Sequence, residues 1–215
     1  MKPNDGARVP LDRWRATWQE LGAADSQQAL FDTLIASYSE PHRRYHTLQH
    51  LEECLAAYAP VRVRAQHPAE IELALWFHDA IYDVRRDDNE ERSAEWARTS
   101  VERAGLAADI GERIAELVMA TKHGRHTAST RDAGILVDVD LSILGAERAR
   151  FDEYERQVRE EYAWVPESIY QRARRKVVDQ FLARPRIYST DYFYSTLEAR
   201  ARDNLERSIA SLRKA

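Results

Sequence analysis

The sequence predicts an all-α protein, a single compact helical bundle of about eight to ten helices. Two observations carry this prediction. The chain of 215 residues has only seven glycines and seven prolines, and 32% of its residues are charged. Its apolar residues recur mostly at spacings of three and four, which is the period of an amphipathic helix. The best candidate for a strand, residues 135–140, has β-branched residues but lies between helical patterns.

The N-terminal part of the chain predicts an arm followed by two helices. Residues 1–10 are polar and contain two prolines, so we expect a flexible arm there. Residues 11–21 place apolar side chains on one face of a helix that ends at Gly22. Asp25 or Ser26 can cap the second helix.

Four helices are predicted in the middle of the chain, and each has a recognisable start. Thr47 can cap the first, and Pro68 can occupy the first turn of the second. Asp88 can cap the third, and Ala108 or Asp109 opens the fourth.

The C-terminal part predicts three more helices, over residues 147–163, 166–183 and 190–212. The last helix is expected to bury four apolar side chains, those of Tyr194, Leu197, Leu205 and Ile209. No internal repeat or interdomain linker stands out, so residues 11–215 are predicted to form one domain.

Charge and cysteine usage narrow the function classes. Lys plus Arg is 32 and Asp plus Glu is 36, a net charge of -4, which argues against general affinity for nucleic acids or membranes. Cys54 is the only cysteine, which excludes an intramolecular disulfide and a cysteine-based zinc site. The start lacks an apolar signal segment, and no run approaches the roughly 18 apolar residues of a membrane span. We therefore expect a soluble, cytoplasmic protein.

The dipeptide His78-Asp79 is the most unusual feature of the sequence, because it ends the apolar run of residues 71–77. Burying an imidazole and a carboxylate costs several kcal/mol unless a metal or hydrogen bonds compensate. Adjacent helical residues point about 100° apart, so both reach one ion only if it lies between their directions. The alternative is a histidine at a helix end beside a solvated aspartate.

Two further pairs could supply metal ligands. His46 and His50 are four residues apart, so they share a face if both are helical. Asp138 and Asp140 interrupt a hydrophobic segment, where buried carboxylates need cations or hydrogen bonds. The alternatives are a surface or core histidine pair, and an aspartate that caps a turn.

The order of these residues resembles a known family. The chain is similar to the H…HD…D signature of the HD superfamily of metal-dependent phosphohydrolases in the order His50, His78-Asp79 and a distant Asp140. Residues 45–50, Tyr-His-Thr-Leu-Gln-His, look like the Tyr-His-Asn-x-x-His motif of cyclic-nucleotide phosphodiesterases, with Thr in place of Asn. Residues 140–142, Asp-Leu-Ser, resemble the segment that delivers the last aspartate ligand in those enzymes.

A second resemblance is narrower. Residues 76–83, Trp-Phe-His-Asp-Ala-Ile-Tyr-Asp, and residues 89–94, Asn-Glu-Glu-Arg-Ser-Ala, look like a bacterial subgroup of predicted HD hydrolases without an assigned substrate. The resemblance covers roughly residues 41–145, which we expect to be the metal-site core of the domain.

The HD resemblance implies roles for individual residues. The implied metal ligands are His50, His78, Asp79 and Asp140, and Asp138 is then an outer or structural residue. His46 is implied as a general acid or substrate contact. Asp79 is also expected to act in catalysis, by bridging two ions or orienting the attacking water.

Other polar residues are weaker candidates for the site. His123 and Asp83 are candidates for a second metal or a phosphate, with His126 a lesser one. Asn89 and Glu90 could line the pocket, although helix capping and solvation explain them equally well. Arg43 and Arg44 could clamp a phosphate with paired hydrogen bonds, and surface solvation is their alternative.

The expected function is hydrolysis of a phosphate ester or anhydride in a nucleotide-like small molecule, by metal-activated water. The expected cofactor is one or two divalent ions of Mn, Fe, Ni, Co or Zn, and Mg also suits the ligand set. The expected partner is a phosphorylated small molecule. A homodimer is the other expected partner, since Trp14, Trp18 and the tyrosine-rich residues 188–194 could equally be core or interface. The alternatives are a metal-bound nucleotide-binding or sensor protein with little turnover, a di-iron oxygenase on the same fold, and a purely structural helical protein.

Overall fold

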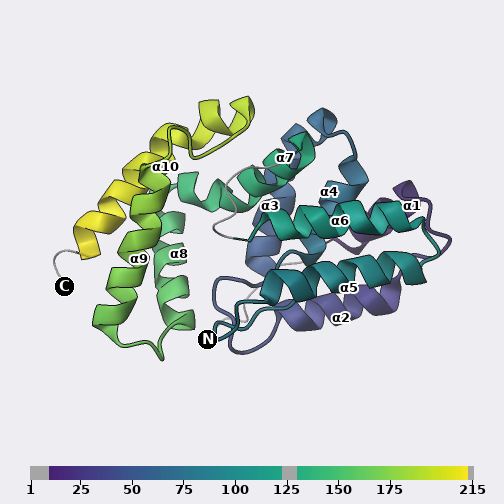
Figure 1. The fold of residues 1–215 in the computed structure, drawn as a ribbon, viewed down its shortest axis with the longest axis horizontal. Coiled ribbons are helices and arrows are strands. Elements are labelled where there is room, and N and C mark those ends of the chain that lie inside the picture. Colours follow the sequence, from purple (N-terminus) through teal and green to yellow (C-terminus); the bar gives the residue numbers. More distant parts are fainter. Residues whose placement is uncertain (1–9, 123–129, 213–215) are drawn as a thin grey trace. The chain divides into compact units, whose positions relative to one another are not determined.

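The computed structural model describes residues 10–122 and 130–212, and these residues form ten α-helices, two short 3₁₀ helices and no strand (Figure 1). This confirms the prediction of an all-α fold. The contacts within the chain divide it into two units, the first ending at Val137 and the second beginning at Asp138. The prediction of one domain over residues 11–215 stays a prediction.

The first unit contains seven helices and the beginning of an eighth. They are α1 (Leu11–Glu20), α2 (Gln28–Tyr38), α3 (Leu48–Tyr58), η1 (Ala59–Arg64), α4 (Pro68–Phe77), α5 (Asn89–Arg103), α6 (Ala108–Ala120) and the start of α7 (Arg131–Asp140). Helices α5 and α6 run side by side in Figure 1 and pack against each other.

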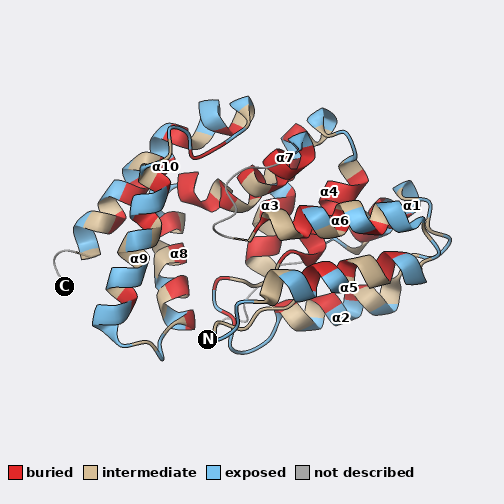
Figure 2. Ribbon diagram, in the orientation of Figure 1, coloured by how far each residue is buried: buried red, intermediate tan, exposed pale blue. Residues whose placement is uncertain are grey.

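Helix α4 is the centre of the first unit. It packs against α1, α3, α5 and α6, and every residue from Ala69 to Phe77 is buried (Figure 2). A helix that is apolar almost all round can be stable only where neighbours cover every face. Pro68 lies in its first turn, where the missing N–H of proline breaks no hydrogen bond.

An aromatic cluster attaches α1 and α2 to α4. The ring centroid of Trp76 lies 5.1 Å from that of Trp14 and 5.8 Å from that of Phe31. The ring centroids of Trp14 and Trp18 are 5.5 Å apart. The indole N–H of Trp14 donates to the carbonyl of Ser26 at 2.8 Å. Rings at these distances bury a large apolar area, so the cluster fixes one face of α4.

Two glutamates of α4 are buried, which the apolar pattern did not predict. The Glu70 carboxylate accepts from Nε and Nη2 of Arg113 at 2.8 and 2.7 Å. The Glu72 carboxylate accepts from Arg13 Nε at 2.6 Å and from Arg62 Nε at 3.2 Å. Buried carboxylates are tolerated when they are paired and hydrogen-bonded. Three arginines from other elements therefore compensate the negative charges of these two glutamates.

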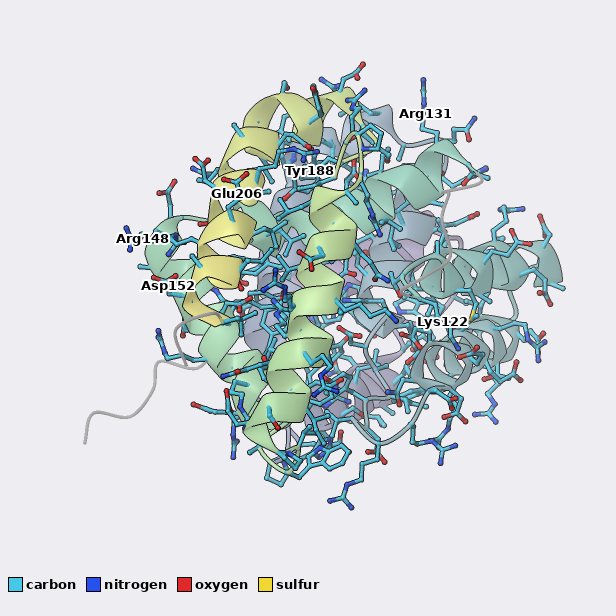
Figure 3. All side chains as sticks on the ribbon, turned by 60° about the vertical axis from the view of Figure 1, so that its left-hand side comes forward. Lys122, Arg131, Arg148, Asp152, Tyr188 and Glu206 are labelled. Carbon is cyan, nitrogen blue, oxygen red and sulfur yellow. The ribbon has the colours of Figure 1, made fainter. Side chains whose placement is uncertain are left out.

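The second unit contains the end of α7 and four further helices. They are η2 (Leu141–Gly145), α8 (Arg148–Glu161), α9 (Glu167–Leu182) and α10 (Asp191–Leu212). Helix α10 packs on η2 and α9. Asp152 of α8, labelled in Figure 3, accepts from Arg207 of α10 at 2.6 Å. A Cβ at Gly145 would lie 2.7 Å from the Cβ of Leu197, so glycine allows this close approach.

Residues 135–140, the best strand candidate, belong to helix α7, in agreement with the all-α prediction. One expectation about an individual residue of α10 was wrong. Tyr194 is 42% exposed, with the guanidinium of Arg186 3.9 Å above its ring, whereas the preceding Phe193 is buried. At the start of α10, Phe193 rather than Tyr194 therefore faces inward, because Tyr194 can keep its apolar ring under an arginine and its hydroxyl in water, whereas Leu205 is buried as predicted. Among the described helices, none is long and apolar enough to cross a membrane.

The start of α4 yields the first prediction. The buried Asp132 carboxylate accepts from the backbone N–H groups of Gln66 and His67, both at 2.8 Å. The substitution Asp132→Ala leaves both groups unpaired and should lower the free energy of unfolding by about 1–2 kcal/mol. Asp132→Asn, which keeps one acceptor, should lose less. Urea denaturation measures both, and the exposed control Asp12→Ala should change the free energy by under ~0.5 kcal/mol. An equal effect of Asp132→Ala and Asp12→Ala would contradict the assignment.

Candidate metal centre

Helices α3 and α4 bring three polar side chains together in the first unit. His50 is the third residue of α3, and His78 directly follows the last residue of α4. The packing of α3 against α4 places the two imidazoles side by side, and they are 2% and 1% exposed. Asp79, the next residue, keeps 19% of its side chain exposed.

The distances within this group match a shared ion. Nε2 of His50 lies 3.1 Å from Nε2 of His78, and the Oδ2 atom of Asp79 lies 3.4 and 3.1 Å from these two nitrogens. Two ligand atoms that bind one ion through bonds of 2.0–2.1 Å are separated by about 2.9–3.4 Å. The triangle of two nitrogens and one oxygen therefore already has the size of one face of a coordination shell.

The tautomer of His78 suits a metal ligand. Its Nδ1 lies 2.8 Å from the carbonyl oxygen of Leu75, which can only accept, so Nδ1 carries the proton. The Nε2 lone pair is then directed at His50 and Asp79. A backbone carbonyl that fixes the far nitrogen of a histidine is the usual outer support of a metal-bound imidazole.

Asp79 is held in its ionised form. Burial acts to raise the pKa of this carboxyl group. The positive charge that His78 and His46 carry when they are protonated, together with the hydrogen bonds of His50 and His78, outweighs burial and holds the pKa of Asp79 well below its usual range. The cluster thus combines two imidazole nitrogens and a carboxylate, a donor set that could hold a divalent metal ion.

The thiol of Cys54 lies beside the cluster and was missed in the sequence, although its spacing of four residues from His50 could have revealed it. One donor atom each of His50, Cys54 and His78 fall within 4.8 Å of one another. The Cys54 sulfur is 3.7 Å from both ring nitrogens of His50. The Oδ2 atom of Asp79, at 3.4 Å from Nε2 of His50, lies closer to that nitrogen than the sulfur does.

Arg43 is not placed as a phosphate clamp. It is buried, and its guanidinium donates to Asp79 O at 2.6 Å, Ala80 O at 3.0 Å and His46 O at 3.2 Å. Its charge lies between the rings of Tyr38 and Tyr82, 5.2 and 5.6 Å from their centroids. Arg43 therefore joins the loop that carries His46 to the dipeptide that carries Asp79.

His46 and Arg44 lie at the more open side of this loop. The imidazole of His46 stacks on the Tyr82 ring at 4.0 Å with an interplanar angle of 26°. It is half-buried, and its ring centroid is 6.0 Å from that of His50. Arg44 is exposed and donates through Nη1 to the carbonyl of Pro41 at 2.9 Å.

The residues of the narrower resemblance fasten the loop after Asp79 to α5. The amide of Asn89 donates to Asp83 O at 2.9 Å and accepts from Asp83 N at 3.1 Å. Ser93 Oγ accepts from the N–H of Ile81 at 3.0 Å, and the Asp83 carboxylate accepts from the N–H of Arg85. These contacts give Asp83 and Asn89 a structural task, while Glu90 is half-buried at the start of α5.

The remaining predicted residues lie elsewhere. Asp138 is buried in the second unit, where its carboxylate accepts from the backbone N–H and hydroxyl groups of Ser189 and Thr190. Burial raises the pKa of Asp138, and these four hydrogen bonds oppose the shift. Asp140 is the last residue of α7, and its role as a ligand stays a prediction. His123 and His126 lie outside the described residues.

Comparisons of this chain with family models, with curated proteins and with solved structures find no match.

The cluster predicts stoichiometric metal binding that depends on His78 and Asp79. After chelation and reloading with Mn²⁺, Fe²⁺ or Zn²⁺, the native protein should retain bound ion through gel filtration. His78→Ala and Asp79→Ala should retain almost none, because each removes one of three converging donors. Elemental analysis measures the content.

His67→Ala is the matched control, because His67 is half-exposed and lies before α4 rather than after it. Native-like metal content in His78→Ala would rule out the centre.

Proposed function

We propose that this protein is a metal-dependent phosphohydrolase of the HD type, acting on a phosphate ester or anhydride of a nucleotide-like small molecule. The triangle formed by His50, His78 and Asp79 is the observation that carries the proposal. These are three of the four residues that the HD resemblance implies as ligands. Asp140 would be the fourth.

A divalent ion in such a site lowers the pKa of a coordinated water and neutralises charge on a phosphoryl group. His50 and His78 contribute neutral donors, and Asp79 contributes the negative charge that favours a cation over a proton. The exposed fraction of Asp79 provides the approach for a substrate, because both imidazoles are fully covered.

His46 is the proposed general acid. Imidazole is the side chain that most readily gives and takes a proton near neutral pH. Stacking on Tyr82 holds the ring of His46 in one orientation, and Arg43 fixes its carbonyl. The half-buried imidazole has its ring centroid 6.0 Å from that of His50, which supports a role in protonating a leaving oxygen.

A metal-bound sensor with little turnover is the second candidate function. The near-complete burial of His50 and His78 favours it, since a covered ion exchanges ligands less readily. The two functions differ in one observable: a sensor binds nucleotides without releasing phosphate.

A phosphatase and nucleotide screen with the native metal tests the proposal. We expect phosphate release from at least one substrate class, and a decrease in kcat of about 10²–10⁴-fold in His46→Asn. The metal content of that variant should be native, because His46 is not a ligand. His42→Asn is the control, because His42 is exposed and its Nε2 lies 2.8 Å from the Tyr82 carbonyl oxygen and 3.9 Å from the Glu40 carboxylate. Tight nucleotide binding without phosphate release across the screen would contradict hydrolysis and select the sensor.

A further inference from the structure

Among the residues that the structure describes, Arg43 is the only arginine or lysine that is buried. A buried guanidinium is costly unless its N–H groups find acceptors. Its Nε–H donates to the carboxylate of Glu40 at 3.0 Å, and Glu40 is itself exposed. The other hydrogen bonds of Arg43 go to backbone carbonyls, so the ion pair explains only one edge of the guanidinium.

The carbonyl contacts of Arg43 link two residues of the candidate site. The Nη1 atom donates both to the carbonyl oxygen of Asp79 at 2.6 Å and to that of His46 at 3.2 Å. The Nη2 atom donates to the carbonyl oxygen of Ala80 at 3.0 Å. These carbonyls follow the end of α4 at Phe77, where the helix no longer supplies partners. One nitrogen atom therefore joins the backbone of a metal ligand to the backbone of the proposed general acid.

Tyr38 of α2 fixes the other backbone group of Asp79. Its hydroxyl accepts from the N–H of Asp79 at 3.3 Å and donates to the carbonyl oxygen of Trp76 at 3.2 Å. The guanidinium carbon of Arg43 lies 5.2 Å from the centroid of the Tyr38 ring, at which distance a cation and an aromatic ring attract each other. Two buried side chains from outside α4 thus hold the N–H and the C=O of Asp79.

We propose that Arg43 and Tyr38 are positioning residues of the metal centre. They hold the backbone of Asp79 so that its carboxylate stays directed at the two imidazoles, and Arg43 also fixes the place of His46. Groups that orient a metal ligand typically contribute about 10–100-fold to metal affinity or activity. The positioning of Asp79 needs only the metal centre, whereas the positioning of His46 for catalysis rests on the proposed function.

The chain offers a matched control for each of the two residues. Arg113 donates through Nε and Nη2 to Glu70, in the first turn of α4. Tyr58 is buried and donates through its hydroxyl to the carbonyl oxygen of Pro68, the first residue of α4, at 2.9 Å. Both side chains stabilise the opposite end of the same helix, so their loss weakens the packing of α4 without releasing Asp79.

The first test measures the dissociation constant of Mn²⁺ by titrating the chelated, full-length protein, at a temperature where circular dichroism shows each variant to be folded. Arg43→Lys removes the planar fork and should weaken Mn²⁺ binding by about tenfold or more. Tyr38→Phe removes one hydroxyl, and it should weaken binding by about 2–10-fold. Arg113→Lys and Tyr58→Phe should bind Mn²⁺ as the native protein does. The visible absorption of the Co²⁺-loaded protein, which reports ligand geometry, should change in Arg43→Lys and stay native in both controls.

The second test asks whether Arg43 acts through His46. At saturating metal and substrate, Arg43→Lys should lower kcat in the native background and lower it much less in the His46→Asn background, because the double variant has already lost the acid. Equal decreases in the two backgrounds would contradict the positioning of His46. Absence of hydrolysis would contradict the proposed function instead, and the Mn²⁺ titration would still decide whether Asp79 is positioned.

Two results of the titration would overturn the inference. Native Mn²⁺ affinity in Arg43→Lys is the first, and native affinity in Tyr38→Phe takes its place if Arg43→Lys does not fold. The second is an equal decrease in Arg113→Lys or Tyr58→Phe, which would assign the effect to the stability of α4 rather than to Asp79.

Discussion

The complete burial of α4 is the constraint on which the first unit depends. A helix covered on all sides must have its polar groups compensated from other elements, and Arg13, Arg62 and Arg113 do so for its two glutamates. Because those ion pairs and the aromatic cluster fix α4, they also fix the position of its C-terminal end. His78 and Asp79 emerge at that end, next to His50 on α3.

The same constraint explains why the dipeptide is tolerated. An imidazole that is 1% exposed needs partners for both of its nitrogens. In His78, the partner of Nδ1 is the Leu75 carbonyl, and the neighbours of Nε2 are His50 and Asp79. The lone pairs of two nitrogens and a carboxylate oxygen that are directed at one point repel one another. A cation bound between the three atoms would remove this repulsion. The ordered loop before α3, held by Arg43, and the ordered loop before α5, held by Asn89, keep that point in place.

The helices were predictable from the sequence because apolar spacing acts locally. Helix α4 starts at Pro68 and α5 directly after Asp88, as predicted, although the Asp88 side chain makes no capping hydrogen bond. It was harder to predict which residues of a helix are buried where an aromatic side chain is stable both in the core and at the surface. Tyr194, which lies at the surface under the guanidinium of Arg186, is the example. The segment at residues 135–140 is helical because its β-branched residues are outweighed by tertiary packing, which propensity does not contain. The prediction of an all-α fold does not depend on any one of these segments, since it rests on the apolar spacing of many segments of the sequence.

The site was predictable only in part, for a related reason. Ordered motifs pointed to His50, His78 and Asp79, and the structure brings these three together. They could not show that Arg43 faces inward or that Asp138 accepts hydrogen bonds from Ser189 and Thr190, because both facts depend on contacts between distant segments.

The most direct test of the central claim is a crystal structure of the metal-loaded protein with anomalous data collected at the absorption edge of the ion. The account predicts one anomalous peak about 2.0–2.3 Å from Nε2 of His50, from Nε2 of His78 and from the Asp79 carboxylate. A peak elsewhere, or none at full metal content, would contradict it.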